Sequence, residues 1–473
     1  MIFRKSPPIA IGTAFQSQIR RSLAVYAIGD GWTGAMGTGS LDSFVPGHDD
    51  DDVEILEAED KPLLVYEGSV KDVAAGWGHS AFISEDGSLF VSGKPYDFST
   101  LLRTRRLPQF LRKQILGTGN DKQQGFTPPK VIGQILSWMV GKEDGPGGPW
   151  EEAERNSTLL TPTRLQPEAG SSLKFSSVAA SAGLTALITT DGDLMTFGLN
   201  HHGQCGVGEF SNNVWAPQAV VGLSSEFASE GRSAFTQEHP IEQVALGLQH
   251  GVALDATGQV FVWGKGERGQ LGIQDQHTDS SPFARGVSKF RLPSVDGSQR
   301  WISQPRMTKI GAGMNHSVAL SEDNLLFVWG KNVAQPTVDG KIADDSSVPI
   351  AVKGLPEKQV VDVACASHHT SVLLEDGSVY GFGIPRDGKT PMLEAIEQIP
   401  AGVIDMPCRQ FEGFFDRTTV VGSDGEQVLH AQLWSDLDMR EYGVFTPVWR
   451  DSLDSRIKGV HRGWLHTLVV TEF

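Results

Sequence analysis

The sequence predicts an all-β fold in which copies of one repeat close into a ring. A short segment recurs in register along the chain, and each clear copy contains a turn dipeptide between two apolar runs. Glycine accounts for 54 of the 473 residues, well above the roughly 7% norm, which indicates many tight turns. Both observations favour short strands over long helices.

The copies of the repeat can be aligned position by position. Five clear copies begin at Val73, Val178, Val244, Ile310 and Val363, and a degenerate sixth begins at Phe411. A seventh begins at Val460 and stops where the other copies make their turn. Its missing half occurs at the other end of the chain, as LAVYAIGDGWTGAMGTG from Leu23. We therefore predict that the ring closes by pairing the N-terminal strand with the C-terminal strands.

Each copy is predicted to contain a β-hairpin. Its two apolar runs are separated by Asp-Gly or a near equivalent, such as Asp86-Gly87, Asp191-Gly192 and Asp376-Gly377. Such pairs adopt positive φ at little cost and close two-residue hairpins. A single repeat cannot bury both faces of its strands, so stability requires that neighbouring repeats stack.

The repeat resembles a known family. The pattern G-x-x-H-S/T, then D-G, then a strand ending in W/F-G, then G-Q-L-G is similar to the regulator-of-chromosome-condensation repeat; the last element survives as Gly269-Gln270-Leu271-Gly272. The resemblance implies a seven-bladed β-propeller with a four-stranded antiparallel sheet in each blade. We expect one propeller over residues 23–473, preceded by a tail at residues 1–22. Blade one should carry a long insertion at about residues 95–160, because its copy and the next start 105 residues apart.

Charge and cysteine usage narrow the function classes. A formal net charge of -17 opposes a generally nucleic-acid-binding surface, because phosphate recognition needs clustered Lys and Arg. Cys205, Cys365 and Cys408 lie far apart, so neither a disulfide framework nor a CxxC metal site is indicated, and a reducing compartment fits best. No apolar run approaches 18 residues, so a membrane-spanning helix is not expected. We expect no cofactor and no metal.

The N-terminus has the composition of an organelle transit peptide. Arg4, Lys5, Arg20 and Arg21 occur with several serines, and no acid precedes Asp30. A short tail ahead of the first strand is the alternative. The composition favours a mitochondrial location, with the cytoplasm or nucleus as the other possibilities.

Two charged segments depart from the repeat. The insertion in blade one places Arg103, Arg105 and Arg106 among leucines, which could serve an acidic partner or RNA, although a solvated loop helix is the more common role of such a segment. Its second part has the spacing of a short amphipathic helix up to Val140. Acids cluster at residues 48–60 and could attract a basic partner, but such runs more often keep a loop solvated.

The fifth position of the repeat is predicted to form a ring near one face. Its occupants include four large apolar side chains, Trp77, Met314, Phe415 and Trp464. We interpret these as candidate anchors for a protein partner, with core packing as the default role of aromatic residues in such repeats.

A histidine recurs at the seventh position, as His79, His250, His316, His369 and His466. A catalytic role needed once would not recur in every blade, so we expect a structural role: a hydrogen bond from each imidazole to a nearby strand carbonyl. No Ser-His-Asp or Cys-His arrangement and no phosphate-binding loop stands out, so no catalytic residue is predicted.

A non-enzymatic scaffold or regulator that is a monomer is therefore the predicted function. The resemblance implies three more specific settings. They are guanine-nucleotide exchange on a small GTPase, a mitochondrial role in ribosome assembly or GTPase regulation, and ultraviolet perception. The last is disfavoured because its repeated Gly-Trp-Arg-His-Thr is reduced here to Gly76-Trp77-Gly78-His79-Ser80. A ubiquitin ligase would need an appended catalytic domain.

Overall fold

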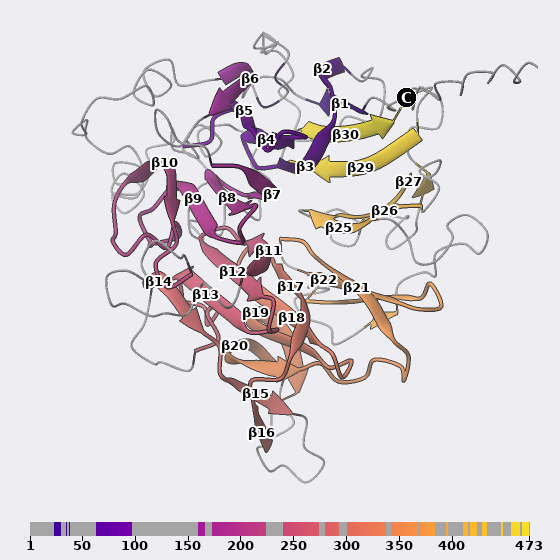
Figure 1. Ribbon diagram of the computed structural model, residues 1–473. Coiled ribbons are helices and arrows are strands. Elements are labelled where there is room, and N and C mark those ends of the chain that lie inside the picture. The colour runs from indigo at the N-terminus through magenta and orange to yellow at the C-terminus, as the bar shows by residue number, and fades with distance from the viewer. Residues whose placement is uncertain are drawn as a thin grey trace, which may run out of the picture.

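A computed structural model describes the residues in the repeats and few of the residues between them. The described residues are 23–29, 35, 37, 63–96, 159–165, 173–223, 240–273, 280–292, 300–336, 342–367, 369–383, 394–395, 410–414, 417–422, 428–432, 446–447, 456–463 and 466–472. All regular structure in these residues is β-strand, arranged as sheets around a ring (Figure 1).

The first three blades are complete four-stranded sheets whose successive strands pair antiparallel. Blade one holds β3 (Val70–Ala75), β4 (His79–Ser84), β5 (Leu89–Gly93) and β6 (Leu159–Leu165). Blade two holds β7 (Phe175–Ala180), β8 (Leu184–Thr189), β9 (Leu194–Leu199) and β10 (Asn213–Ala219). Blade three holds β11 (Ile241–Leu246), β12 (His250–Asp255), β13 (Val260–Lys265) and β14 (Ser280–Gly286).

Blades four to six continue the pattern. Blade four holds β17 (Met307–Ala312), β18 (His316–Ser321), β19 (Leu326–Pro336) and β20 (Ile342–Ala351). Blade five holds β21 (Val360–Cys365), β22 (Thr370–Leu374), β23 (Val379–Phe382) and β24 (Glu394–Ala395). Blade six holds β25 (Gln410–Phe414), β26 (Arg417–Val421), β27 (Val428–Gln432) and β28 (Thr446–Pro447).

Blade seven joins the two ends of the chain, as predicted. Its strand order is β2-β1-β30-β29, with β1 (Leu23–Gly29) and β2 (Leu63–Glu67) from the start of the chain and β29 (Arg456–Arg462) and β30 (His466–Glu472) from its end. β1 pairs with β30 over its whole length, from Leu23 opposite Glu472 to Gly29 opposite His466. The fold is therefore a seven-bladed propeller closed through its terminal strands.

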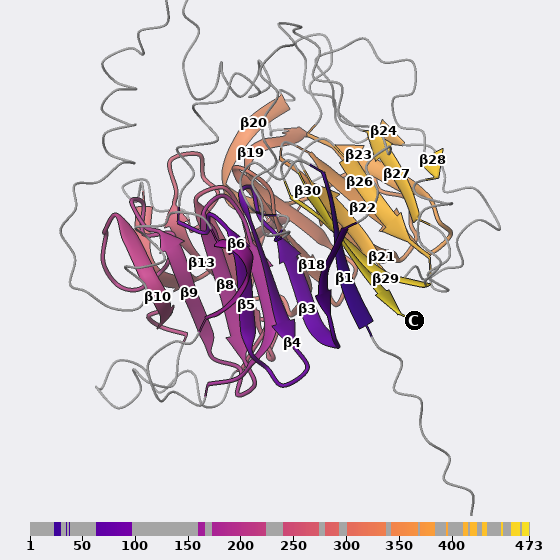
Figure 2. The same cartoon turned by 90° about the horizontal axis from the view of Figure 1, so that it is seen from above.

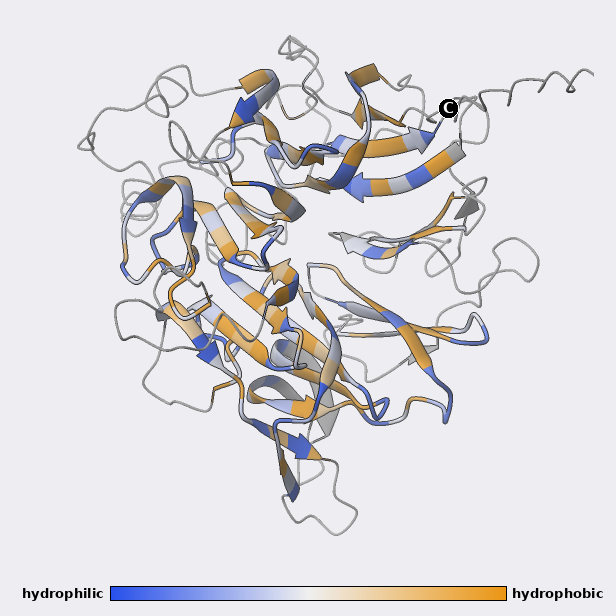
Figure 3. Cartoon of the chain, viewed as in Figure 1, coloured by the Kyte–Doolittle hydropathy of each residue, from blue (hydrophilic) through white to orange (hydrophobic). Residues whose placement is uncertain are grey.

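The hydrophobic core lies between blades. The second strands β4, β8, β12 and β18 are buried at every residue, because each sheet has another sheet on both sides. One cluster joins Val252 and Val262 of blade three to Ala319 and Trp329 of blade four. Another joins Val25 and Leu468 of blade seven to Phe82 of blade one, so the core also runs across the closure. Figure 3 shows hydrophobic stretches along these stacked strands.

Blade four has two strands more than the predicted four. β15 (Lys289–Leu292) and β16 (Arg300–Ser303) form an antiparallel hairpin, and β15 pairs in parallel with β20 through Arg291 and Ile350. The hairpin belongs to the connection between β14 and β17, and it lies at the outer end of the blade, far from the ring centre (Figure 1). The sequence analysis did not predict it.

Candidate functional site

The ring has two faces, and Figure 2 shows it edge-on, with the strands running from one face to the other. In an antiparallel blade, successive turns alternate between the two faces. The turn between first and second strands carries Trp77, and the connection from third to fourth strand begins beside it, where Lys94 N–H donates to the Gly78 carbonyl (2.8 Å). We call this side the Trp77 face. The Asp-Gly turns and the links to the next blade share the opposite side, the Asp-Gly face.

The fifth-position residues lie where neighbouring blades meet on the Trp77 face. Trp77 N–H donates to the Ser181 carbonyl of blade two (3.3 Å), and Met314 N–H donates to the Ser367 carbonyl of blade five (3.0 Å). Both side chains are only 5% exposed. The expected ring of these positions is present in the described blades, and its large side chains are packed between blades there. Their role as partner anchors stays a prediction.

Four of the five repeated histidines connect their blade to the next one, and the fifth, His369, is also buried. His79 Nε2 bonds Thr185 Oγ1 (2.9 Å), His250 Nε2 bonds Ser317 Oγ (2.9 Å), His316 Nε2 bonds Thr370 Oγ1 (3.0 Å) and His466 Nε2 bonds Ser80 Oγ (2.8 Å). We call these four residues the histidine belt. The expected hydrogen bonds from these imidazoles to a neighbouring strand are present, but the expected carbonyl acceptor is wrong. The partner is a hydroxyl in the adjacent blade, at the position that follows the histidine in the motif, and no carbonyl takes that place.

The geometry of the belt fixes the histidine tautomer at two seams, which is our term for the interfaces between neighbouring blades. Ser317 Oγ donates to the Gln270 carbonyl (3.0 Å) and Ser80 Oγ donates to the Ala35 carbonyl (2.7 Å). With each hydroxyl proton so used, the imidazole Nε2–H must donate, which leaves Nδ1 unprotonated. Nδ1 of His250 and of His466 is buried without a hydrogen-bond partner.

Burial keeps the belt neutral. Desolvation lowers the pKa of His79 and His250 from 6.5 to about 3, and that of His316 and His466 to about 4. A proton on Nδ1 would place a positive charge in an apolar site with no acceptor. These histidines are therefore neutral structural hydrogen-bonding groups and not acid-base groups.

The glycine of the G-x-x-H motif makes room for the imidazole. A Cβ on Gly247 would lie 2.1 Å from Cε1 of His250, and a Cβ on Gly313 would lie 2.1 Å from Cε1 of His316. The backbone of the next blade is also too close for a side chain, with the Gly313 carbonyl oxygen 2.6 Å from a Cβ on Gly247. The motif therefore needs glycine for close approach at a seam.

A second set of inter-blade bonds surrounds the ring centre. First strands of neighbouring blades lie side by side there, and several carry a β-bulge just before the first position of the repeat. The bulge aims a polar side chain at the next blade. Asp72 accepts from Val178 N–H (2.8 Å) and Ser177 Oγ (2.6 Å). Gln410, on a strand with a regular register, bonds both main-chain groups of Val460 (2.8 and 2.9 Å). Lys309 pairs with Asp362 at 2.7 Å.

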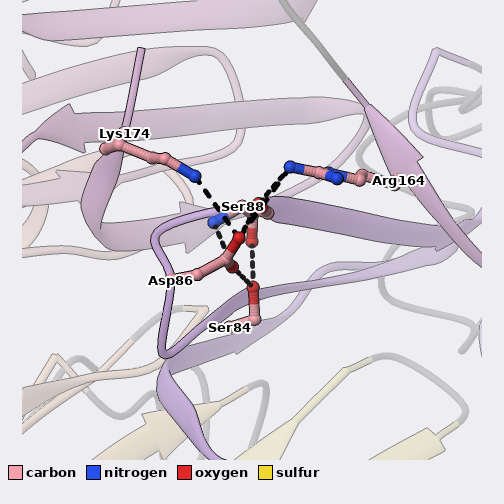
Figure 4. Close-up of polar contacts among 5 residues, drawn as sticks. All are labelled: Ser84, Asp86, Ser88, Arg164 and Lys174. Atoms are coloured by element: carbon pink, nitrogen blue, oxygen red, sulfur yellow. Dashed lines mark hydrogen bonds and ion pairs between the residues drawn. The ribbon is translucent and has the colours of Figure 1, made fainter. Parts of the chain in front are cut away.

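The Asp-Gly face carries a polar cluster at the turn of blade one (Figure 4). Asp86 accepts from Ser84 Oγ (2.5 Å) and Ser88 Oγ (2.8 Å), and these hydrogen bonds hold the pKa of its carboxyl well below the usual range. Lys174 Nζ lies 3.3 Å and Arg164 3.8 Å from the same carboxylate. All three charged side chains are largely exposed, so the cluster orders the turn and contributes little stability.

The remaining predicted site residues fall outside the described residues. These are Arg103, Arg105, Arg106, Phe415, Trp464, the acidic segment 48–60 and the expected helix up to Val140. Within the described ranges, no group of three or more His, Cys, Asp or Glu is placed to hold a metal ion. No helix among them is long and apolar enough to cross a membrane.

Family models recognise the repeats directly. The regulator of chromosome condensation (RCC1) repeat matches residues 191–254 and 257–320, and a second model of this repeat matches 70–97, 241–270 and 307–334. The chain is an RCC1-repeat protein.

Several known proteins share this repeat with the chain. The ultraviolet-B receptor UVR8 of Arabidopsis thaliana is 26% identical over 79% of the chain and 77% of its own length. The probable E3 ubiquitin-protein ligase HERC6 of Homo sapiens is 32% identical over 42% of the chain, which spans 17% of that protein. The guanine nucleotide exchange factor SRM1 of Saccharomyces cerevisiae is 32% identical over 32% of the chain and 31% of its own length. The relatives thus include an ultraviolet-B receptor, a probable ubiquitin-protein ligase and a guanine nucleotide exchange factor.

Solved RCC1-like structures share the fold at low identity. Human WBSCR16 superimposes with a TM-score of 0.62 at 14% identity, over 95% of this chain and 98% of that one. Yeast RCC1 (Prp20), solved bound to Kap60, gives 0.58 at 16% identity, over 96% and 89%. Both comparisons cover nearly the whole ring, so the propeller extends beyond the repeats that the family models match.

Proposed function

We propose that this RCC1-repeat protein is a non-catalytic interaction protein that docks a protein partner on its Trp77 face. The proposal rests on one observation, the positions at which the two longest connections between described strands begin and end. Between β5 and β6 the chain runs from Gly93 to Leu159, and between β1 and β2 from Gly29 to Leu63. Both are connections from a third to a fourth strand, and their flanking strands end on the Trp77 face of adjacent blades.

The charges of these connections support a protein partner. One contains Arg103, Arg105 and Arg106, and the other contains the acids of residues 48–60. A partner surface that carries both signs of charge would be oriented by these two segments and would associate faster. Loops on a rigid ring are also where recognition residues of repeat proteins usually lie.

The non-catalytic part of the proposal rests on the histidine belt. The residues that recur with reactive side chains are held neutral and buried between blades. Cys205 and Cys365 are similar, because burial raises the pKa of both thiols, that of Cys365 to about 12. These groups stabilise the ring and are poor nucleophiles or bases.

Site-specific crosslinking tests which face binds. A photoreactive amino acid is placed at Arg268, on the third-to-fourth connection of blade three, or at Asp323, in the Asp-Gly turn of blade four; both positions are exposed. We expect one protein to be crosslinked from position 268 and not from position 323. Crosslinks from position 323 alone would move the docking site to the Asp-Gly face.

Guanine-nucleotide exchange is the second candidate, favoured by the similarity to SRM1. Exchange would need a small GTPase to bind the ring and lose GDP. Release of fluorescent GDP from the crosslinked GTPase should then accelerate in proportion to added chain. Unchanged release while the two proteins remain bound would leave docking as the function and exclude exchange.

We also propose that the protein works in mitochondria. Residues 1–22 carry Arg4, Lys5, Arg20 and Arg21 without an acid, and β1 begins at Leu23, so cleavage before that residue would leave the closing strand intact. Fluorescence of a C-terminally tagged copy and mass spectrometry of its N-terminus test this. An intact N-terminus outside mitochondria would contradict it.

A further inference from the structure

The stretch that leads from the last strand of blade three to the first strand of blade four, and contains the β15–β16 hairpin, is strongly basic in an otherwise acidic protein. Residues 285–309 contain six cations and a single acid, Asp296, whereas the whole chain has a net charge of -17. The cations are Arg285, Lys289, Arg291, Arg300, Arg306 and Lys309. The sequence analysis did not single out this stretch, because its cations are spread along the chain and not consecutive.

Three of these cations lie on the β15–β16 hairpin. Arg306 pairs with Glu322 (3.7 Å) and Lys309 with Asp362 (2.7 Å), so those two are already matched. The hairpin carries Lys289, Arg291 and Arg300, and no ion pair joins any of them to a carboxylate of the described residues. Lys289 and Arg300 are exposed and Arg291 is half-buried.

The register of the hairpin turns two of the cations outward. Phe290 lies opposite Ile302, and Phe290 is 1% exposed in the core of blades three and four. Neighbouring positions on a strand point to the other side, and residues directly opposite each other share a side. Lys289, Arg291 and Trp301, which lies opposite Arg291, therefore share the side that faces away from the core.

The hairpin also ends in an open edge. β16 is the outermost strand of the six-stranded sheet and pairs only with β15 among the described strands. An open edge presents main-chain groups that an extended peptide can pair with. Lys289 and Arg291 are two residues apart on a strand, which spaces them about 7 Å along it, the spacing of alternate side chains in an extended peptide.

We propose that the outward side of the β15–β16 hairpin binds an extended acidic segment of a partner protein. Alternate carboxylates of that segment would meet Lys289 and Arg291, and Trp301 would supply an apolar contact beside Arg291. Arg300 lies opposite Leu292, on the other side at the end of the hairpin, where its exposed side chain would meet a further acid at the end of the segment. This surface is separate from the Trp77 face and goes beyond the function proposed above.

A protein segment fits better than RNA. Binding to a phosphate backbone draws most of its affinity from counterion release, and typical nucleic-acid sites contact about 6–10 phosphates. The hairpin offers three cations, within a protein whose net charge of -17 repels a long polyanion. A short acidic peptide carries less charge and can use the open edge of β16.

The test uses the full-length chain and a fluorescein-labelled peptide of alternating Glu and Thr, (Glu-Thr)6. Fluorescence anisotropy compares the wild type with a triple variant, Lys289→Glu, Arg291→Glu and Arg300→Glu. A control variant with the same charge change, Lys71→Glu, Arg164→Glu and Arg268→Glu, alters exposed cations in blades one and three. The hairpin variant should weaken binding by about tenfold or more, as expected for three exposed ion pairs, and the control by about twofold at most.

Three outcomes would overturn the proposal. These are no binding of (Glu-Thr)6 by the wild type, equal loss in both variants, and tighter binding of a twelve-nucleotide single-stranded RNA that the hairpin variant abolishes. The last would assign the surface to nucleic acid. A Gln triple variant, Lys289→Gln, Arg291→Gln and Arg300→Gln, controls for folding, since it removes the charges without adding repulsion and should also lose binding with an unchanged melting curve.

Discussion

Closure of the ring through β30 is the structural feature with the largest predicted effect on stability. We expect deletion of residues 466–473 to abolish cooperative unfolding. The deletion removes Leu468, Val469 and Val470, which are 1%, 0% and 6% exposed. At about 1.5–3 kcal/mol for each fully buried side chain, this loss is about 5–9 kcal/mol. That is comparable with the whole stability of a typical folded protein, about 5–15 kcal/mol.

The assay is urea unfolding followed by tryptophan fluorescence and by far-ultraviolet circular dichroism. Deletion of residues 1–22 is the matched control, because it stops before β1 and should leave the transition unchanged. A circular permutant that joins Phe473 to Leu23 and opens the chain near residue 120 should unfold at least as steeply as the wild type, since β30 and β1 become a local hairpin. A C-terminal deletion that unfolds like the full chain would refute closure as the source of stability.

Three smaller perturbations test the seams. Because the histidine belt has its pKa lowered from 6.5 to about 3 or 4, the unfolded chain binds more protons below pH 6.5, and stability should fall as the pH drops from 6.5 towards 4. The loss should approach about 2 kcal/mol per histidine at pH 5, and an unchanged urea midpoint between pH 7.5 and 5 would contradict this. Gly247→Ala should destabilise by about 1–3 kcal/mol, whereas Gly286→Ala, whose Cβ meets only the flexible end of Gln259, should have little effect on the thermal midpoint. Asp72→Ala should cost about 2–3 kcal/mol in urea unfolding, more than Asp86→Ala, because Asp72 accepts three hydrogen bonds between and within blades; equal losses would contradict that ranking.

The fold could be predicted because its determinants recur. Each hairpin depends on a turn pair that can be recognised within one copy of the repeat. An example is Asp376-Gly377, where Gly377 has a φ of 83°. Closure could be predicted because the seventh copy is split, and its missing half begins at Leu23. Neither prediction required knowledge of which residues touch.

The seams could not be fully predicted because their partners lie in different copies. The hydroxyl that pairs with His79 belongs to Thr185, 106 residues away. The motif H-S/T shows both a histidine and a hydroxyl, yet one copy alone does not show that its histidine bonds the hydroxyl of the next copy. The extra hairpin β15–β16 was missed for another reason: it occurs once, so no repetition marks it.

Seams that lack the motif show that departures from the repeat need not mark function. Blade two has Leu184 in place of the belt histidine, and there Ser181 Oγ donates to the Gly247 carbonyl of blade three (2.7 Å). Blade six has Arg417 in place of the belt histidine, and there Gln410 bonds both main-chain groups of Val460 of blade seven (2.8 and 2.9 Å). The degenerate sixth copy thus keeps an inter-blade bond with different residues.

Selection on such a ring acts on the seam as a whole, because any polar pair that spans it satisfies the buried groups. Loss of the motif in blade six therefore carries little information about a binding site. Features that occur once, at the outer edge of the ring, are more informative about a binding site, since the ring does not need them in order to close. The six-stranded blade four is such a feature: without β15 and β16 it would still have the four strands that the other blades use. An addition that the fold does not require, and that gathers cations in a protein of net charge -17, is the part of the described chain where a binding function is best sought.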